Sequence, residues 1–138
     1  MVPDFLLLYA IITVLFSLAY FFLASLPFLL VRLDIPDVSR LFRGLFNVYF
    51  WMVAATGLVA TTVFVLGARL GIATELLVIT LVAILMRKRV LQWIDGLQIL
   101  GQSGDTLAMR RLRKLHWSVM TANLAVLGMV ISSLNHIL

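Results

Sequence analysis

Residues 5–31 read FLLLYAIITVLFSLAYFFLASLPFLLV, a run of 27 residues without a charged side chain. At a rise of about 1.5 Å per residue, a helix of this length extends about 40 Å, which exceeds the roughly 30 Å hydrocarbon core of a bilayer. The run therefore predicts a tilted transmembrane helix, and Pro27 is expected to kink its last turn. Because the run is much longer than the roughly 7–15 apolar residues of a secretory signal, we expect it to be retained.

Three further apolar runs predict three more spans. Residues 44–68 provide 25 residues without a charge and predict the second span. Residues 71–86 give a shorter third run of 16 residues that includes Glu75, and the helical spacing of apolar side chains continues to about residue 101. The fourth span is expected over residues 115–138, with a basic helical segment before it. The third and fourth helices should therefore form a long hairpin that projects beyond the membrane.

Turn and capping residues lie between these runs. Asp37 or Ser39 is expected to cap the second helix, because either side chain can accept a hydrogen bond from a free backbone amide. Gly104 suits a left-handed cap at the end of the third helix, and Asp105 suits the N-cap of the fourth. These positions set the expected helix boundaries outside the apolar runs.

The composition favours a lipid environment. The chain is 63% hydrophobic and 12% charged, whereas a soluble domain averages about 45–50% apolar and about 25% charged residues. A globule of 138 residues could not bury so much apolar surface. We therefore expect an all-α fold in which residues 1–138 form one integral membrane domain, an antiparallel four-helix bundle with helices three and four extended into a cytoplasmic hairpin. The absence of cysteine excludes disulfides and thiolate chemistry.

Positive charge is gathered on one side of the predicted membrane. Three basic residues follow the first span, and seven lie between the third and fourth: Arg87, Lys88, Arg89, Arg110, Arg111, Arg113 and Lys114. The other side has Arg69 as its one basic residue. The positive-inside rule puts the larger group in the cytoplasm and both termini outside, as expected for a bacterial inner membrane. The net charge of +5 therefore suits anionic inner-leaflet headgroups as partners, and no nucleic acid is expected.

Polar side chains inside predicted spans are costly, so each is a candidate for a site. His116 and Asn123 share one face of the fourth helix with Met120, and Ser118 lies beside that face. A histidine with an asparagine farther along the same face could ligate a haem or metal, or relay protons. Alternatively, His116 lies at the headgroup boundary and Asn123 bonds a neighbouring helix. His136 is expected near the opposite membrane face, about 30 Å away.

A second candidate is a solute or proton site between the spans, formed by Glu75, Thr61 and Tyr20. Each of these residues also has a structural interpretation. Glu75 would complement the dipole at a helix N-terminus, and Tyr20 would anchor the helix at the membrane interface. Thr61, four residues after Gly57, would let two helices approach closely.

Two stretches of the chain resemble a known family. Residues 41–50, LFRGLFNVYF, open the second span, and residues 111–118, RLRKLHWS, precede Asn123 in the fourth. Together they are similar to a small four-span membrane family of unknown function related to the transmembrane-protein-205-like domain, and more loosely to four-span proteins likened to anthrone oxygenases. The family often has proline where this chain has Asn47. The resemblance implies a four-helix bundle rather than an activity, and it marks as residues of interest Tyr49, His116, Ser118 and Asn123.

The chain contains no nucleotide-binding, zinc-protease or nucleophile-elbow motif, so no catalytic residue, metal site or named cofactor is predicted. The leading hypothesis is association with a second copy or with a membrane partner complex through the basic hairpin. A salt bridge from Asp95 to Arg110 or Arg113 would brace that hairpin. The alternatives are binding or transport of a small solute through a cavity between the spans, and oxidase- or oxygenase-like cofactor binding at His116.

Overall fold

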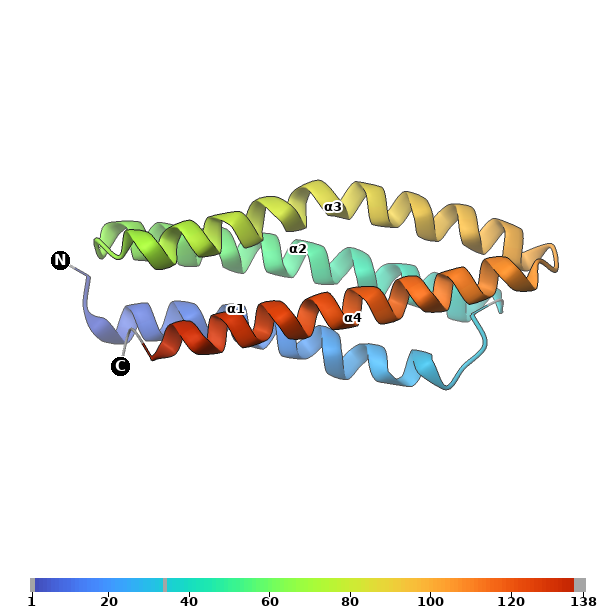
Figure 1. The fold of residues 1–138 in the computed structure, drawn as a ribbon, viewed down its shortest axis with the longest axis horizontal. Helices are drawn as coiled ribbons and strands as arrows, with labels where there is room; N and C mark the ends of the chain where they lie inside the picture. The colour runs from blue at the N-terminus through green and yellow to red at the C-terminus, as the bar shows by residue number, and fades with distance from the viewer. Residues whose placement is uncertain (1, 34, 136–138) are drawn as a thin grey trace.

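The computed structural model describes residues 2–33 and 35–135, and within those ranges its regular elements are all helices (Figure 1). They are α1 (Asp4–Ser25), the 3₁₀ turn η1 (Leu26–Leu29), α2 (Pro36–Leu66), α3 (Leu70–Gln102) and α4 (Thr106–Leu134). The all-α fold expected from the sequence is confirmed. The expected end of the last span at residue 138 and the position of His136 lie outside the described residues.

The four α-helices lie along one common long axis, and each runs antiparallel to the next (Figure 1). α1 begins and α4 ends at one end of the bundle, while the α1–α2 connection and the α3–α4 turn lie at the other. α2 packs most extensively against α3 and then against α1, whereas α4 has fewer contacts, with α1 and α3. α4 is therefore less enclosed than α2.

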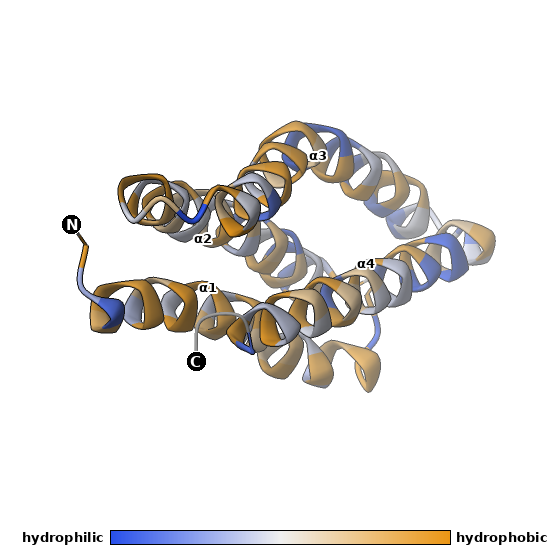
Figure 2. Ribbon diagram, turned by 60° about the vertical axis from the view of Figure 1, so that its left-hand side comes forward, coloured by the Kyte–Doolittle hydropathy of each residue, from blue (hydrophilic) through white to orange (hydrophobic). Residues whose placement is uncertain are grey.

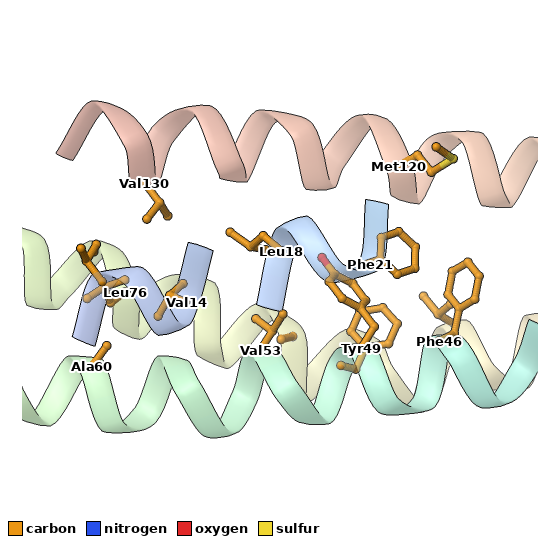
Figure 3. Close-up of a cluster of buried hydrophobic side chains, with 14 of the residues drawn as sticks. Val14, Leu18, Phe21, Phe46, Tyr49, Val53, Ala60, Leu76, Met120 and Val130 are labelled. Atoms are coloured by element: carbon orange, nitrogen blue, oxygen red, sulfur yellow. The ribbon is translucent and has the colours of Figure 1, made fainter. Parts of the chain in front are cut away.

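Apolar side chains from all four helices meet in one core. Figure 3 shows Phe21 of α1 beside Tyr49 of α2, with Leu76 of α3 and Met120 of α4 directed into the same interior. The outer faces are apolar as well, and each helix is long and apolar enough to cross a membrane. In Figure 2, hydrophobic residues follow the outside of the bundle, and hydrophilic residues gather toward the α3–α4 turn.

The first apolar run does not stay α-helical to residue 31. α1 ends at Ser25 and continues as η1, because Pro27 has no N–H to donate to the carbonyl four residues earlier. The kink expected at Pro27 is therefore a change of helix type. Carbonyls at this end are bonded by Arg113 of α4, whose guanidinium donates to the Phe28 oxygen at 2.8 Å and to the Val31 oxygen at 2.7 Å.

α2 begins well before the second apolar run, and the side-chain cap expected for it is wrong. Ile35 occupies the N-cap position, and neither Asp37 nor Ser39 caps the helix. Pro36 starts the helix instead, because its fixed φ suits the first helical position and its missing N–H needs no partner there. Ser39 lies inside the first turn, where its hydroxyl donates to the Leu33 carbonyl at 2.9 Å.

The long α3–α4 hairpin is confirmed as a structural unit. α3 runs without a break through its basic residues to Gln102. Gly104 adopts a φ of +98°, the left-handed region expected for the turn. The Asp105 carboxylate accepts hydrogen bonds from the amides of Leu107 at 3.0 Å and Ala108 at 3.1 Å, as an N-cap should.

The salt bridge expected from Asp95 to Arg110 or Arg113 is wrong. Asp95 accepts a hydrogen bond from the Arg43 Nε of α2 at 2.6 Å. The early start of α2 carries Arg43 alongside α3, and Arg113 is engaged with η1 instead. Since both side chains of the Arg43–Asp95 pair are 44% exposed, the pair contributes no more than about 1 kcal/mol.

α2 and α3 come into close contact at Gly57. A Cβ at this position would overlap the Thr80 hydroxyl of α3. That hydroxyl donates to the Leu76 carbonyl of its own helix at 2.8 Å, and Thr61 donates in the same way to the Gly57 carbonyl at 2.7 Å. The close approach expected around Gly57 and Thr61 is therefore present, and it depends on the missing side chain of Gly57.

Replacing Gly57 by alanine (G57A) should lower the free energy of unfolding by about 1–3 kcal/mol, the usual cost of overpacking. The double variant G57A/T80A should recover most of that loss, because it removes the overlapping hydroxyl. G128A in α4 is the matched control, since nothing lies within 4 Å of the added Cβ. Thermal unfolding in detergent, followed by circular dichroism, measures all three; a melting temperature of G57A equal to that of the unmodified chain would contradict the contact.

Candidate functional site

A long groove of about 540 Å³ lies between α3 and α4. Its α3 wall extends over residues 78–93 and its α4 wall over residues 115–129, while Leu18 of α1 and Tyr49 of α2 lie at its floor. Figure 2 shows the two helices apart over this stretch and together near the α3–α4 turn. The lining is mainly apolar, and the side chains in it with hydroxyl or amide groups are those of Tyr49, Ser118 and Asn123.

The groove stays open because the two helices touch near its ends and carry small side chains, such as that of Ala122, between them. Near the turn, Met109 of α4 occupies the space where a side chain at Gly101 of α3 would lie. Toward the other end, the Ser133 hydroxyl of α4 donates to Oε2 of Glu75 in α3 at 2.8 Å. These two contacts hold α3 and α4 together on either side of the groove.

The floor of the groove is a hydrogen-bonded link between three helices. The Tyr49 hydroxyl of α2 donates to Oδ1 of Asn123 in α4 at 2.8 Å. Nδ2 of Asn123 donates in turn to the Leu18 carbonyl of α1 at 3.0 Å. Both polar side chains are buried, and the ring of Tyr49 lies 4.0 Å from that of Phe21 between centroids (Figure 3). This link bears out the expectation that Asn123 bonds a neighbouring helix.

The floor also retains hydrogen-bonding capacity. An amide such as Asn123 carries a second N–H and a second oxygen lone pair, and the Tyr49 oxygen can accept a bond while it donates one. Ser118, nearer the mouth of the groove, is exposed and donates to the Lys114 carbonyl at 2.9 Å. The groove can therefore hold an apolar molecule and offer a few hydrogen bonds near one end of it.

His116 lies in the interior of the bundle. Its side chain is fully buried, and its ring centroid is 5.1 Å from that of Phe42 and 6.0 Å from that of Phe46. Neither ring nitrogen has a hydrogen-bond partner among the described residues. A haem or metal at His116 would have to displace one of these aromatic rings. Across residues 2–33 and 35–135, no three metal-ligating side chains gather around a common point.

The residues expected to form a solute site are placed apart. Tyr20 is 41% exposed on the outer face of α1. Thr61 is buried against α3 and bonded to its own helix, while Glu75 is bonded to Ser133. The groove between α3 and α4 is formed by other residues.

Two of the seven basic residues of the hairpin are occupied within the chain. Arg87 donates to the Asn47 side-chain oxygen at 2.7 and 3.0 Å and lies over the Trp51 ring, 4.6 Å from its centroid. Asn47 therefore has a defined contact at the position where the resembling family often has proline. Arg113 binds the carbonyls of Phe28 in η1 and of Val31 just after it. Five remain exposed at the surface: Lys88, Arg89, Arg110, Arg111 and Lys114.

Sequence reasoning identified Tyr49, Ser118 and Asn123 but not the groove that joins them. A signal is present in the chain: small and β-branched residues follow one face of α3, at Val78, Val82 and Ala83, and Ala122 lies on the opposing face of α4. Such a pattern is also typical of helices in close contact. Whether such faces leave a groove or pack together depends on how α3 and α4 are aligned, which the sequence alone does not give.

No family model, no curated protein and no solved structure matches this chain. The fold and the groove therefore define a class rather than a family: an all-α protein whose described residues form four long helices, each a candidate membrane span, with an apolar groove between two of them.

Replacing His116 by leucine should raise the free energy of unfolding by about 1–3 kcal/mol, because it removes two buried polar atoms that have no partner. Asn123→Leu is the matched comparison on the same helix, and it should lower stability by a similar amount because it leaves the buried Tyr49 hydroxyl unpaired. Melting temperatures of both variants and of the unmodified chain, measured in the same detergent, give the two changes in stability. A destabilised H116L variant would mean that the imidazole has a partner, such as a buried water.

Proposed function

We propose that this chain is an integral membrane protein that binds a chain-like apolar molecule from the bilayer in the groove between α3 and α4. The observation that carries the proposal is the groove itself: about 540 Å³ of space, lined mainly by apolar side chains, within the usual size range of ligand pockets. Its walls belong to two of the four candidate membrane spans. A molecule dissolved in lipid would therefore reach it from the side.

The shape of the groove favours a single hydrocarbon chain as its occupant. The α3 wall from Val78 to Trp93 extends about 22 Å at the helical rise of about 1.5 Å per residue. Spreading about 540 Å³ over that length gives a cross-section of about 25 Å². Because this space is long and narrow, its shape favours a chain-like molecule over a compact one.

The proposed orientation has the hairpin in the cytoplasm and both termini outside, in a bacterial inner membrane. Three basic residues of the α1–α2 region and seven of the hairpin would then face the same compartment. The hydrogen bonds from Arg113 to η1 support this arrangement, because they bring the α1–α2 connection and the base of the hairpin to one end of the bundle.

Association through the hairpin stays a second prediction. Five exposed cations would carry it, and Ile99, Leu100 and Leu107 add exposed apolar side chains near the tip. We place the groove first because its volume and lining specify the chemistry of an occupant, whereas the hairpin surface specifies only its charge. Cofactor chemistry at His116 is the least favoured of the three, since two aromatic rings enclose the imidazole.

The orientation can be tested with single cysteines, because the chain contains none of its own. Ser103→Cys lies at the hairpin turn and Asn135→Cys at the end of α4, and both positions are exposed. In sealed right-side-out vesicles, a membrane-impermeant maleimide should label N135C at once and S103C only after permeabilisation. The reverse pattern would overturn the orientation, and immediate labelling of both would overturn the membrane crossing.

The groove can be tested by filling it. Ala122→Phe should lower photolabelling of the peptides covering residues 78–93 and 115–129 by a diazirine-bearing fatty acyl chain by about fivefold, since about 1 kcal/mol of packing contact is lost. Ala55→Phe is the control, because Ala55 is exposed on α2 and does not line the groove. Peptide mapping by mass spectrometry gives the readout. Equal labelling of both variants and of the unmodified chain would refute the proposed function.

A further inference from the structure

Resting on the proposed function, we infer that the groove selects an anionic phospholipid, with one acyl chain between α3 and α4 and the phosphate bound by Arg89 and Lys114. The apolar groove and the two cations are separate features, and they meet at the same end of the site. The inference therefore assigns to the groove a ligand with a tail and a charged head.

Helical spacing places Arg89 and Lys114 beside residues that line the groove, one cation on α3 and the other on α4. Arg89 is three residues after Met86 and four before Trp93, both of which line the groove, so it shares their side of α3. Lys114 is four residues before the lining residue Ser118 and shares its side of α4. Both cations are exposed.

The antiparallel register sets how far apart the two cations lie along the bundle axis. Gly101 lies beside Met109 and Glu75 bonds to Ser133, so α3 and α4 keep one register from end to end. In that register Lys114 is level with about residue 95 of α3, six residues beyond Arg89, or about 9 Å along the axis. Because side chains on a helix lean toward its N-terminus, Arg89 flanks the headgroup from the membrane side and Lys114 flanks it from the side of the α3–α4 turn.

No acidic residue of the described chain competes for this pair of cations. Asp95 is bonded to Arg43, Asp37 lies beside Arg40, and Glu75 is bonded to Ser133 at the far end of the groove. Asp105 caps α4, and Asp4 lies at the start of α1. None of the hydrogen bonds and ion pairs found within residues 2–33 and 35–135 involves the side chain of Arg89 or Lys114. An anion from outside the chain would therefore complete the site.

The length of the groove below the cations matches one leaflet of a bilayer. From Arg89 to Val78 there are 11 residues of helix, or about 16 Å. Half of a roughly 30 Å hydrocarbon core is about 15 Å. Arg89 is the third residue after the apolar run 71–86, so it falls where that run would meet the headgroups. An acyl chain that starts at the cations would thus reach the end of the groove near the bilayer midplane.

Native mass spectrometry of the purified full-length protein tests the inference. The probes are phosphatidylglycerol and phosphatidylcholine with identical acyl chains, added in equal amounts, and the readout is the ratio of the retained adducts. We expect about a tenfold preference for phosphatidylglycerol. The double variant R89Q/K114Q should bring the ratio close to one. K88Q/R110Q is the matched control, because it removes the same charge from exposed positions that are not beside the groove, and it should keep the preference.

The outcomes separate the two proposals. If A122F lowers retention of both lipids while R89Q/K114Q leaves the ratio unchanged, the groove binds acyl chains but the headgroup assignment is wrong. If K88Q/R110Q abolishes the preference as fully as R89Q/K114Q, the attraction is diffuse charge and the inferred site is wrong. If A122F changes nothing, or if the protein is recovered as a lipid-free dimer, the proposed function itself fails. Circular dichroism of each variant confirms that the helices remain folded.

Discussion

The close contact between Gly57 and Thr80 determines how the four helices share their surfaces. It brings α3 against α2 over most of their length, so α3 turns one face inward and has little left for α4. α4 is then held by α1 along one side and by α3 mainly toward its two ends. The groove is the space that this unequal packing leaves. A bundle with four equally close seams would have no room for it.

Polar side chains specify how the helices meet in a molecule whose inner and outer faces are both apolar. Hydrophobic burial cannot orient such helices if lipid surrounds them, whereas paired hydrogen bonds can. The link from Tyr49 through Asn123 to Leu18 fixes α2, α4 and α1 at one level. Arg87 with Asn47 does the same for α3 and α2. His116 is the exception, because burial removes its ring nitrogens from water and no described residue forms a hydrogen bond with them.

Except for the cap of α2, features that depend on neighbouring residues could be predicted from the sequence, and features that depend on register could not. The apolar runs predicted four helices, and Gly104 with Asp105 predicted the hairpin turn, because each signal is local. The partner of Asp95 was predicted wrongly, since the alternatives differ only in how α2, α3 and α4 are aligned. Asn123 was singled out as a buried polar residue, but its bond to Tyr49, 74 positions earlier, required the folded bundle. The groove has no sequence signature separate from that of a packed seam.

The two contacts that join α3 and α4 on either side of the groove also fix its mechanics. A pair of rods fastened at both ends can move apart in the middle only by bowing, and a helix whose hydrogen bonds are intact resists sharp bending. Moving α3 and α4 apart to widen the groove therefore costs free energy, because neither helix has a free end about which it could swing. The gap should accept straight hydrocarbon tails of various lengths and resist branched or ring-bearing ones. Because the contacts at Met109 and Ser133 limit the width of the groove, the width of a ligand should decide whether it binds more than its length does.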